Sequence, residues 1–134
     1  MRRQLHRHLL AEEPHLRWNA FIDLLAVESY ADLDPSQRPA HLVFWYESEV
    51  QNGGHGQYFE NQGVGRIEEV LAALSQFGLS EHASVLRSAV QAFRRGDAAR
   101  LSLADTEFHA CSDSIVQVLH RHLDESASNY VELV

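Results

Sequence analysis

The glycine-rich segment 49–63 constrains the fold of this chain more than any other stretch. It holds four glycines and two asparagines between two segments whose apolar residues repeat at helical spacing. Glycine and asparagine tolerate a positive φ, so Asn52-Gly53 is expected to end one helix and Gln62-Gly63 a second, very short one. The segment therefore predicts a helical corner at residues 52–63.

Helical spacing of apolar residues extends over most of the chain on both sides of this corner. Apolar residues recur at i, i+3, i+4 and i+7 in the segments 67–77 and 80–96, and each segment ends at a glycine. Similar spacing predicts helices over 14–30 and 112–123. The stretch 97–108 is looser, and we expect at most a turn of helix after its Ser102.

The helix before the corner has two alternative start signals. Asp34, Pro35 and Gln37 resemble an N-cap, a first helical position and a capping-box acceptor, whereas Pro39 allows a later start. Residues 130–133 are expected to add a short terminal helix. No segment shows sustained alternation of apolar and polar residues, so the prediction is an all-α fold of about six helices.

Length and composition indicate one soluble domain. A chain of 134 residues can bury a core without disulfides, and we expect one domain over 1–134, with the weakest patterns at 1–13 and 125–134. The single Cys111 favours a reducing compartment, and no apolar run approaches the ~20 residues that span a bilayer. The N-terminus lacks the apolar region of a signal peptide. We therefore expect a cytoplasmic protein with no membrane partner.

The formal net charge of −8 disfavours direct binding to nucleic acid, because acidic proteins repel phosphate. The charge is unevenly distributed along the sequence. Acids dominate residues 18–86 and 101–134, while arginines dominate 1–17 and 87–100. The arginines at 87–100 of one chain could meet the acids of a second chain, which would give a homodimer.

The glycine-rich segment also resembles a known family. The run E-V-x-N-G-G-x-x-Q-[YF]-F-x-N-x-G is similar to a motif of a bacterial all-helical family of unknown function that includes DNA-mimic proteins. The matching positions here are Glu49, Asn52, Gly53, Gly54, Gln57, Phe59, Asn61 and Gly63. The sequence departs from that motif at His55, where the family has a large apolar residue, and at Gly56. The resemblance implies a helical fold and, for some members, a protein partner that normally binds DNA.

Local chemistry favours a structural role for most of these motif residues. Glu49 lies near a predicted helix end, and its carboxylate, together with the amides of Asn52, Gln57 and Asn61, is expected to form a polar clamp around the short insert. The alternative is a small metal-dependent hydrolase that uses Glu49 and His55 at the corner. Phosphate binding by the glycines is disfavoured, since no strand precedes them and no G-K-[ST] follows.

The other polar motifs give little support for catalysis. The nine histidines include two H-R-H pairs, but residues two apart on a helix point away from each other. His109 and Asp113 can share a helix face, yet Cys111 between them would point elsewhere, which argues against a Cys-His nucleophile. We therefore expect no metal, no cofactor and no catalytic residue.

The acidic surface remains as the candidate binding site. Acids that lie off the predicted apolar stripes should be exposed: Glu28, Asp32, Asp34, Glu47, Glu60, Glu68, Glu69 and Glu81. Carboxylates fixed along helices can present negative charge as DNA phosphates do, and could attract a basic DNA-binding protein such as a transcription factor. The expected function is a non-enzymatic, acidic protein-binding module that acts as a DNA mimic. An immunity-type protein that blocks a toxin through the same face is a further alternative.

Overall fold

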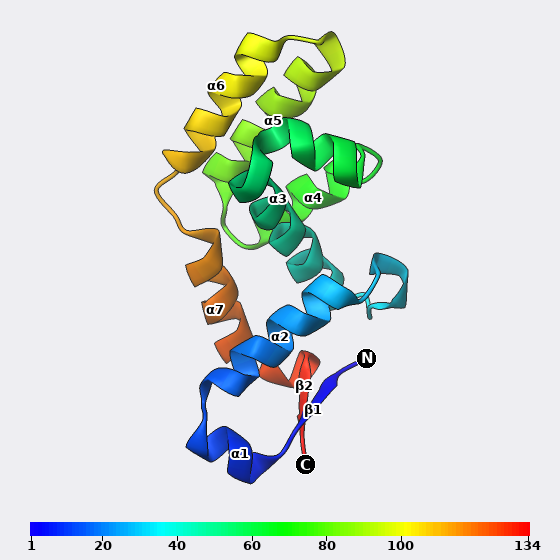
Figure 1. Ribbon diagram of the computed structural model, residues 1–134, viewed down its shortest axis with the longest axis vertical. Coiled ribbons are helices and arrows are strands. Elements are labelled where there is room, and N and C mark those ends of the chain that lie inside the picture. The colour runs from blue at the N-terminus through cyan, green and yellow to red at the C-terminus, as the bar shows by residue number, and fades with distance from the viewer.

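A computed structural model describes all residues, 1–134, and shows a helical domain with one small pair of strands (Figure 1). The elements in chain order are β1 (Arg3–Leu5), α1 (Arg7–Glu12), α2 (His15–Val27), the 3-10 helix η1 (Tyr30–Asp32), α3 (Arg38–Gln62), α4 (Ile67–Gln76), α5 (Ser80–Arg95), α6 (Ala98–His109), α7 (Ile115–Ser126), the 3-10 helix η2 (Ala127–Asn129) and β2 (Val131–Leu133). The predicted all-α class is confirmed. The structure has seven α-helices where about six were expected.

Helix α3 is the central element of the domain. It contacts α2, α4, α5, α6 and α7, so both ends of the molecule are built on it. The hairpin of α5 and α6 forms one end, and the strand pair lies at the other end beside both termini (Figure 1). One continuous apolar core joins these parts, and its fully buried side chains include Phe21, Tyr46, Leu74, Leu86 and Leu119. No helix is both long enough and apolar enough to cross a membrane.

Helices α4 and α5 form where the apolar spacing predicted them. The buried positions of α4 include Ile67, Val70 and Leu74, which follow the predicted stripe. A glycine with positive φ ends each helix, Gly78 at 73° after α4 and Gly96 at 69° after α5. Glycine has no Cβ and therefore adopts a positive φ without steric strain. The glycine after each helix is thus a local signal for the helix end that can be read from the sequence.

Two predictions about the less regular segments were wrong. Helix α6 occupies Ala98–His109, where at most a turn of helix was expected; Asp97 caps it by accepting a hydrogen bond from the Arg100 N–H at 3.0 Å. The expected terminal helix is instead strand β2, which pairs in parallel with β1, so that Arg3 lies opposite Val131. Strands of three residues are too short to show an alternating pattern.

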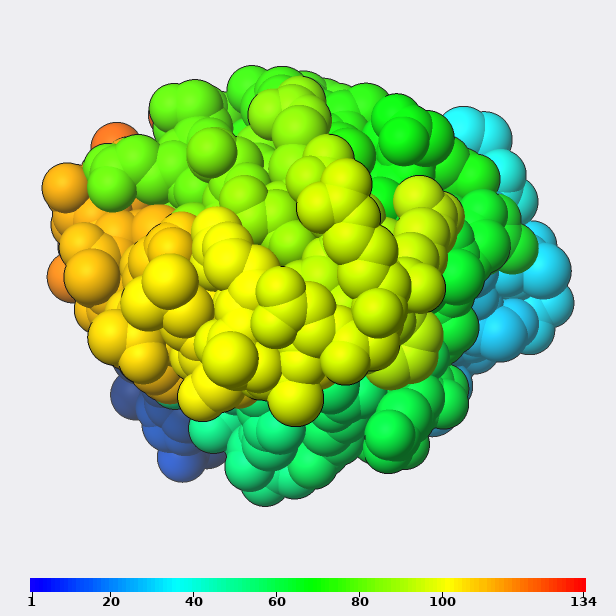
Figure 2. All heavy atoms as spheres, turned by 90° about the horizontal axis from the view of Figure 1, so that it is seen from above, coloured from blue at the N-terminus to red at the C-terminus, as the bar shows by residue number.

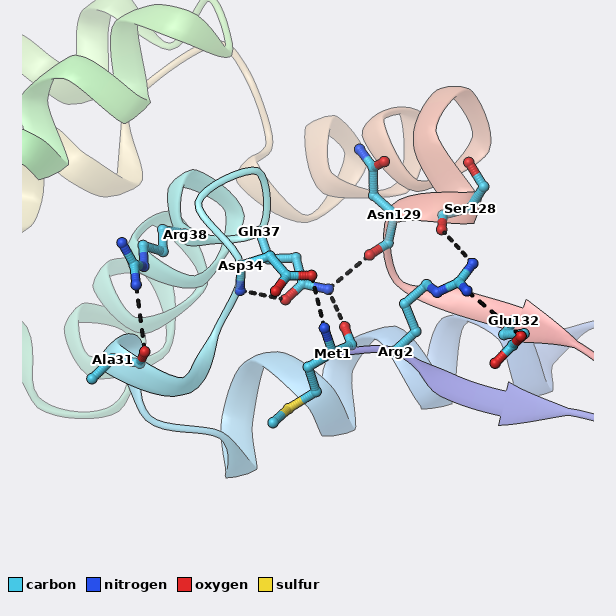
Figure 3. Close-up of polar contacts among 9 residues, drawn as sticks. All are labelled: Met1, Arg2, Ala31, Asp34, Gln37, Arg38, Ser128, Asn129 and Glu132. Atoms are coloured by element: carbon cyan, nitrogen blue, oxygen red, sulfur yellow. Dashed lines mark hydrogen bonds and ion pairs between the residues drawn. The ribbon is translucent and has the colours of Figure 1, made fainter.

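Hydrogen bonds of the Gln37 side chain connect both ends of the chain to the start of α3 (Figure 3). Its side chain is fully buried, and its Nε2 donates to the backbone oxygens of Met1 and Asn129, the latter at 2.7 Å. Its Oε1 accepts from the Asp34 N–H at 3.0 Å, which is the bond that the capping-box alternative predicted. The helix itself begins at Arg38, however, with Pro39 in its first turn.

Candidate functional site

The glycine-rich corner divides α3 into two helical segments. Backbone dihedrals leave the helical region at Gly53 (φ −154°, ψ 15°) and Gly54 (φ 80°, ψ 179°), and Gly63 (φ 75°) ends the second segment. Only glycine adopts the conformation of Gly54 readily. A Cβ on Gly54 would also lie 2.5 Å from Oδ2 of Asp105 on α6. The break therefore lies where the sequence predicted it, with the positive φ one residue later than Gly53.

Asp105 connects α6 to the break in α3 through hydrogen bonds with His55. One carboxylate oxygen, Oδ1, accepts from the His55 N–H at 2.8 Å and lies 2.6 Å from the His55 Nδ1. The other ring nitrogen of His55, Nε2, lies 2.8 Å from the Tyr46 hydroxyl. The neutral tautomer with a proton on Nδ1 satisfies all these contacts, because the Tyr46 hydroxyl then donates to Nε2. His55 thus fills an apolar position while every polar atom of its ring has a partner.

Burial shifts the pKa values of His55 and of its hydrogen-bond partner Tyr46. Burial lowers the pKa of His55, although the hydrogen bond to Asp105 and its charge oppose this effect. Burial also raises the pKa of Tyr46 well above its ordinary value, which keeps the hydroxyl protonated. Both side chains have no exposed surface. The hydrolase alternative required a substrate to reach His55, and the ring offers no surface for that contact.

The polar clamp of the corner centres on Glu49. Its Oε2 accepts a hydrogen bond from Asn61 at 2.8 Å and a longer one from Gln57 at 3.4 Å. Asn52 is exposed and makes no side-chain hydrogen bond, so the structure does not place it in the clamp. Phe59 is buried and packs on Phe93 of α5, with ring centroids 4.9 Å apart. Glu49, Gln57 and Asn61 therefore form the clamp, and Phe59 anchors the corner to α5.

Three of the eight acids expected on the binding surface are paired with cations. Glu28 is half-buried and lies 2.9 Å from Arg3; Asp34 lies 2.7 Å from the Met1 amino group. Glu69 lies 3.5 Å from Arg66 and also accepts from the Tyr30 hydroxyl. The pairs of Glu28 and Asp34 connect distant elements, so the sequence could not show them, whereas Arg66 and Glu69 are a local i, i+3 pair. The negative potential at these three positions is weaker than the sequence suggested.

The remaining five acids make no ion pair. Glu60, Glu68 and Glu81 are exposed, and Asp32 is exposed with its carboxylate hydrogen-bonded to the Ser29 hydroxyl at 2.8 Å. Glu47 is half-buried, and burial raises the pKa of its carboxyl. Glu60 and Glu68 belong to neighbouring turns, at the end of α3 and the start of α4, two helices that pack together. Both carboxylates are free, one on each of these two helices.

Free positive charge is concentrated on a different helix. Arg87, Arg94 and Arg95 on α5 are exposed and make no ion pair, and Figure 2 views the molecule from the end where α5 meets α6. Arg94 and Arg95 lie in the last turn of α5, where cations interact favourably with the helix dipole. No group of three or more histidine, cysteine or acidic side chains is arranged to hold a metal ion.

Comparison with known proteins identifies one family. A family model described as "DMP19-like protein" matches residues 31–132, from η1 to β2, and so includes the glycine-rich corner and the free acids from Asp32 to Glu81. The match leaves out β1, α1 and α2. No curated protein and no solved structure matches the chain.

Proposed function

The chain belongs to the DMP19-like family, and from this premise we propose that it is a non-enzymatic, acidic protein-binding module that acts as a DNA mimic. Its partner would be a basic DNA-binding protein, such as a transcription factor. The proposal agrees with the resemblance of the glycine-rich motif to a family that includes DNA mimics. It assigns the binding to carboxylates that the helices display, with no covalent step.

The observation that carries this proposal is the pair of free carboxylates beside the corner, Glu60 and Glu68. Both are exposed and neither has a cation within ion-pair distance, in a protein whose formal net charge is −8. The corner fixes the backbone of Glu60, because the clamp around Glu49 and the His55–Asp105 contact hold α3 in place. Glu68 lies on α4, which packs against α3. Charges on rigid elements keep their positions before binding. A basic surface can therefore bind them with a smaller loss of conformational entropy.

Charge reversal at this pair tests the proposal. We expect the double variant Glu60→Arg, Glu68→Arg to weaken binding of the chain to its partner by about tenfold or more, since like-charge contacts replace attractive ones. The measurement is capture of DNA-binding proteins from extract of the source cells by the immobilised chain, followed by titration with the purified partner. Higher ionic strength should weaken the wild-type complex as well.

A matched control separates local recognition from total charge. The double variant Glu12→Arg, Glu13→Arg alters exposed acids at the C-terminal end of α1, outside the family match, and changes the net charge equally. We expect it to bind nearly as well as the wild type. Equal loss in both variants, or a complex insensitive to salt, would contradict the proposed surface. A captured partner with no affinity for DNA would instead favour the immunity-type alternative.

A further inference from the structure

A depression between α3, α5 and the loop from α6 to α7 has no role in holding the corner. Its volume is about 240 Å³, and its lining includes Glu47 of α3, His82 of α5, and Phe108, His109 and Asp113 from the end of α6 and the following loop. Sites for substrates and cofactors usually enclose about 300–1,000 Å³. This depression is therefore sized for a single inserted side chain.

His82 is the unusual group in this depression. Its side chain belongs to a residue only 3 % exposed, yet neither ring nitrogen makes a hydrogen bond within the protein, and Nδ1 is completely buried. Buried polar groups in folded proteins are normally hydrogen-bonded. The other buried histidine near the corner, His55, follows this rule through both nitrogens. Burial lowers the pKa of His82, so the ring is neutral near pH 7 and retains an acceptor lone pair.

The carboxylates around the depression have no arginine or lysine partner, and His109 is the one group there whose positive charge opposes the raised pKa of Glu47. Glu47 is half-buried without an ion pair, in contrast to the half-buried Glu28, which is paired with Arg3. Asp113 is exposed and also unpaired, and the charges of Glu81 and Asp113 both act on the His82 ring. A half-buried carboxylate is stabilised by an opposite charge within a few ångströms. The depression therefore suits a positively charged group.

Shape and chemistry favour a guanidinium group over other cations. The Phe108 and His82 rings meet edge to face, with centroids 5.4 Å apart, so flat aromatic groups help to form the wall. A guanidinium is planar, weakly hydrated and presents five N–H donors, whereas a lysine ammonium is compact and strongly hydrated. A metal ion is disfavoured, because the acidic and imidazole groups do not converge as a ligand set.

We propose that this depression receives an arginine side chain of the basic partner, with Glu47 and Asp113 supplying negative charge and the imidazole of His82 accepting a hydrogen bond. The inference rests on the proposed function for the existence of that partner. Arginine is the side chain with which DNA-binding proteins contact phosphates and guanine. A mimic that captures one such arginine would remove a DNA contact from its partner as well as occupy its surface.

The site can be tested on the full chain without the partner. The probe is N-acetyl-arginine amide, titrated into the ¹⁵N-labelled protein and followed by two-dimensional NMR. We expect saturable shifts concentrated at residues 47, 82 and 108–115, and none with the neutral isostere N-acetyl-citrulline amide. The lysine analogue should bind more weakly, because it lacks the planar fork of donors. Shifts spread equally over all acids, including Glu60 and Glu68, would overturn the proposal.

Variants distinguish this site from general attraction to an acidic protein. Glu47→Gln should weaken arginine binding roughly tenfold and His82→Leu should abolish the shifts in the loop. Glu12→Gln, at an exposed position of α1, should leave the affinity unchanged. Glu47 is partly exposed, so its variant keeps the test decisive if His82→Leu does not fold. Unchanged affinity of Glu47→Gln would refute the site. The partner experiment with Glu60 and Glu68 would then still decide the proposed function independently.

Discussion

At the scale of single residues, Gly54 shows how one backbone position determines the course of the central helix. Its φ of 80° and its closeness to Asp105 both exclude a side chain. Gly54→Ala should lower the free energy of unfolding by about 2–4 kcal/mol, from backbone strain and the contact with the carboxylate. Gly65→Ala is the matched control, because a Cβ there meets nothing within 4 Å and the residue has no positive φ. Equal losses in chemical denaturation would contradict this account.

Three buried histidines and the half-buried His122 make the stability of the protein depend on pH. Burial lowers the pKa of His41, His55, His82 and His122 below the ordinary value of about 6.5. The unfolded chain therefore binds more protons than the folded one just below that pH, and stability falls as the pH decreases through 6.5 toward the folded-state values. The raised pKa of Glu47 acts in the opposite direction, but it is one group against four.

Urea denaturation at pH 7.5 and pH 5.5 measures this effect. Each histidine contributes at most about 1.4 kcal/mol per pH unit, so a loss of about 1–4 kcal/mol is expected overall. A His122→Phe variant, which cannot titrate at that position, should show a shallower dependence. Equal or greater stability at pH 5.5 would show that these rings do not stay neutral in the folded protein.

The hydrogen-bond partners of His55 could not be predicted from the sequence, unlike the local contacts of the corner. The motif residues and the local clamp of Glu49 with Asn61 could be inferred, because their spacing along the chain brings them together. Asp105 lies fifty residues from His55. Its role depends on how α6 packs against α3, which no local pattern contains. The same holds for Arg3, which neutralises Glu28 across β1 and α2.

At the scale of elements, α4 and α5 could be predicted and α6 could not. The first two helices carry regular stripes of large apolar residues and end at glycines. Helix α6 buries only Ala104 and Phe108, while Leu103 points to solvent, so its periodicity is weak. Its stability comes from the Asp97 cap and from packing on α5, and tertiary packing is invisible in a single sequence.

Gln37 provides a test of how the elements at the two chain ends are joined. Gln37→Ala removes hydrogen bonds to Asn129 and Asp34 from a fully buried side chain, and should lower the free energy of unfolding by about 2–3 kcal/mol. Gln76→Ala, at an exposed position in α4, is the control and should change it by less than about 0.5 kcal/mol. Thermal or urea denaturation measures both. A Gln37 variant as stable as the control would show that these hydrogen bonds do not stabilise the strand pair.

At the scale of the whole molecule, composition and helical periodicity predicted the fold class, and the net charge is the basis on which a basic partner is proposed. The sequence could not show fully which acids remain free, since the ion pairs with Arg3 and the Met1 amino group join segments far apart in the chain; the Arg66–Glu69 pair is local. These contacts reduce the acidic surface to a smaller set centred on Glu60 and Glu68. The homodimer stays a prediction, for which the unpaired Arg94 and Arg95 are the available contact points.

The central claim is that fixed carboxylates on this scaffold occupy the surface with which a basic protein binds DNA. Competition between the chain and a labelled DNA duplex for the purified partner measures this claim most directly. We expect the chain to release the duplex completely, and about tenfold more of the Glu60→Arg, Glu68→Arg variant to be needed for the same release. A stable complex of chain, partner and duplex together would contradict it.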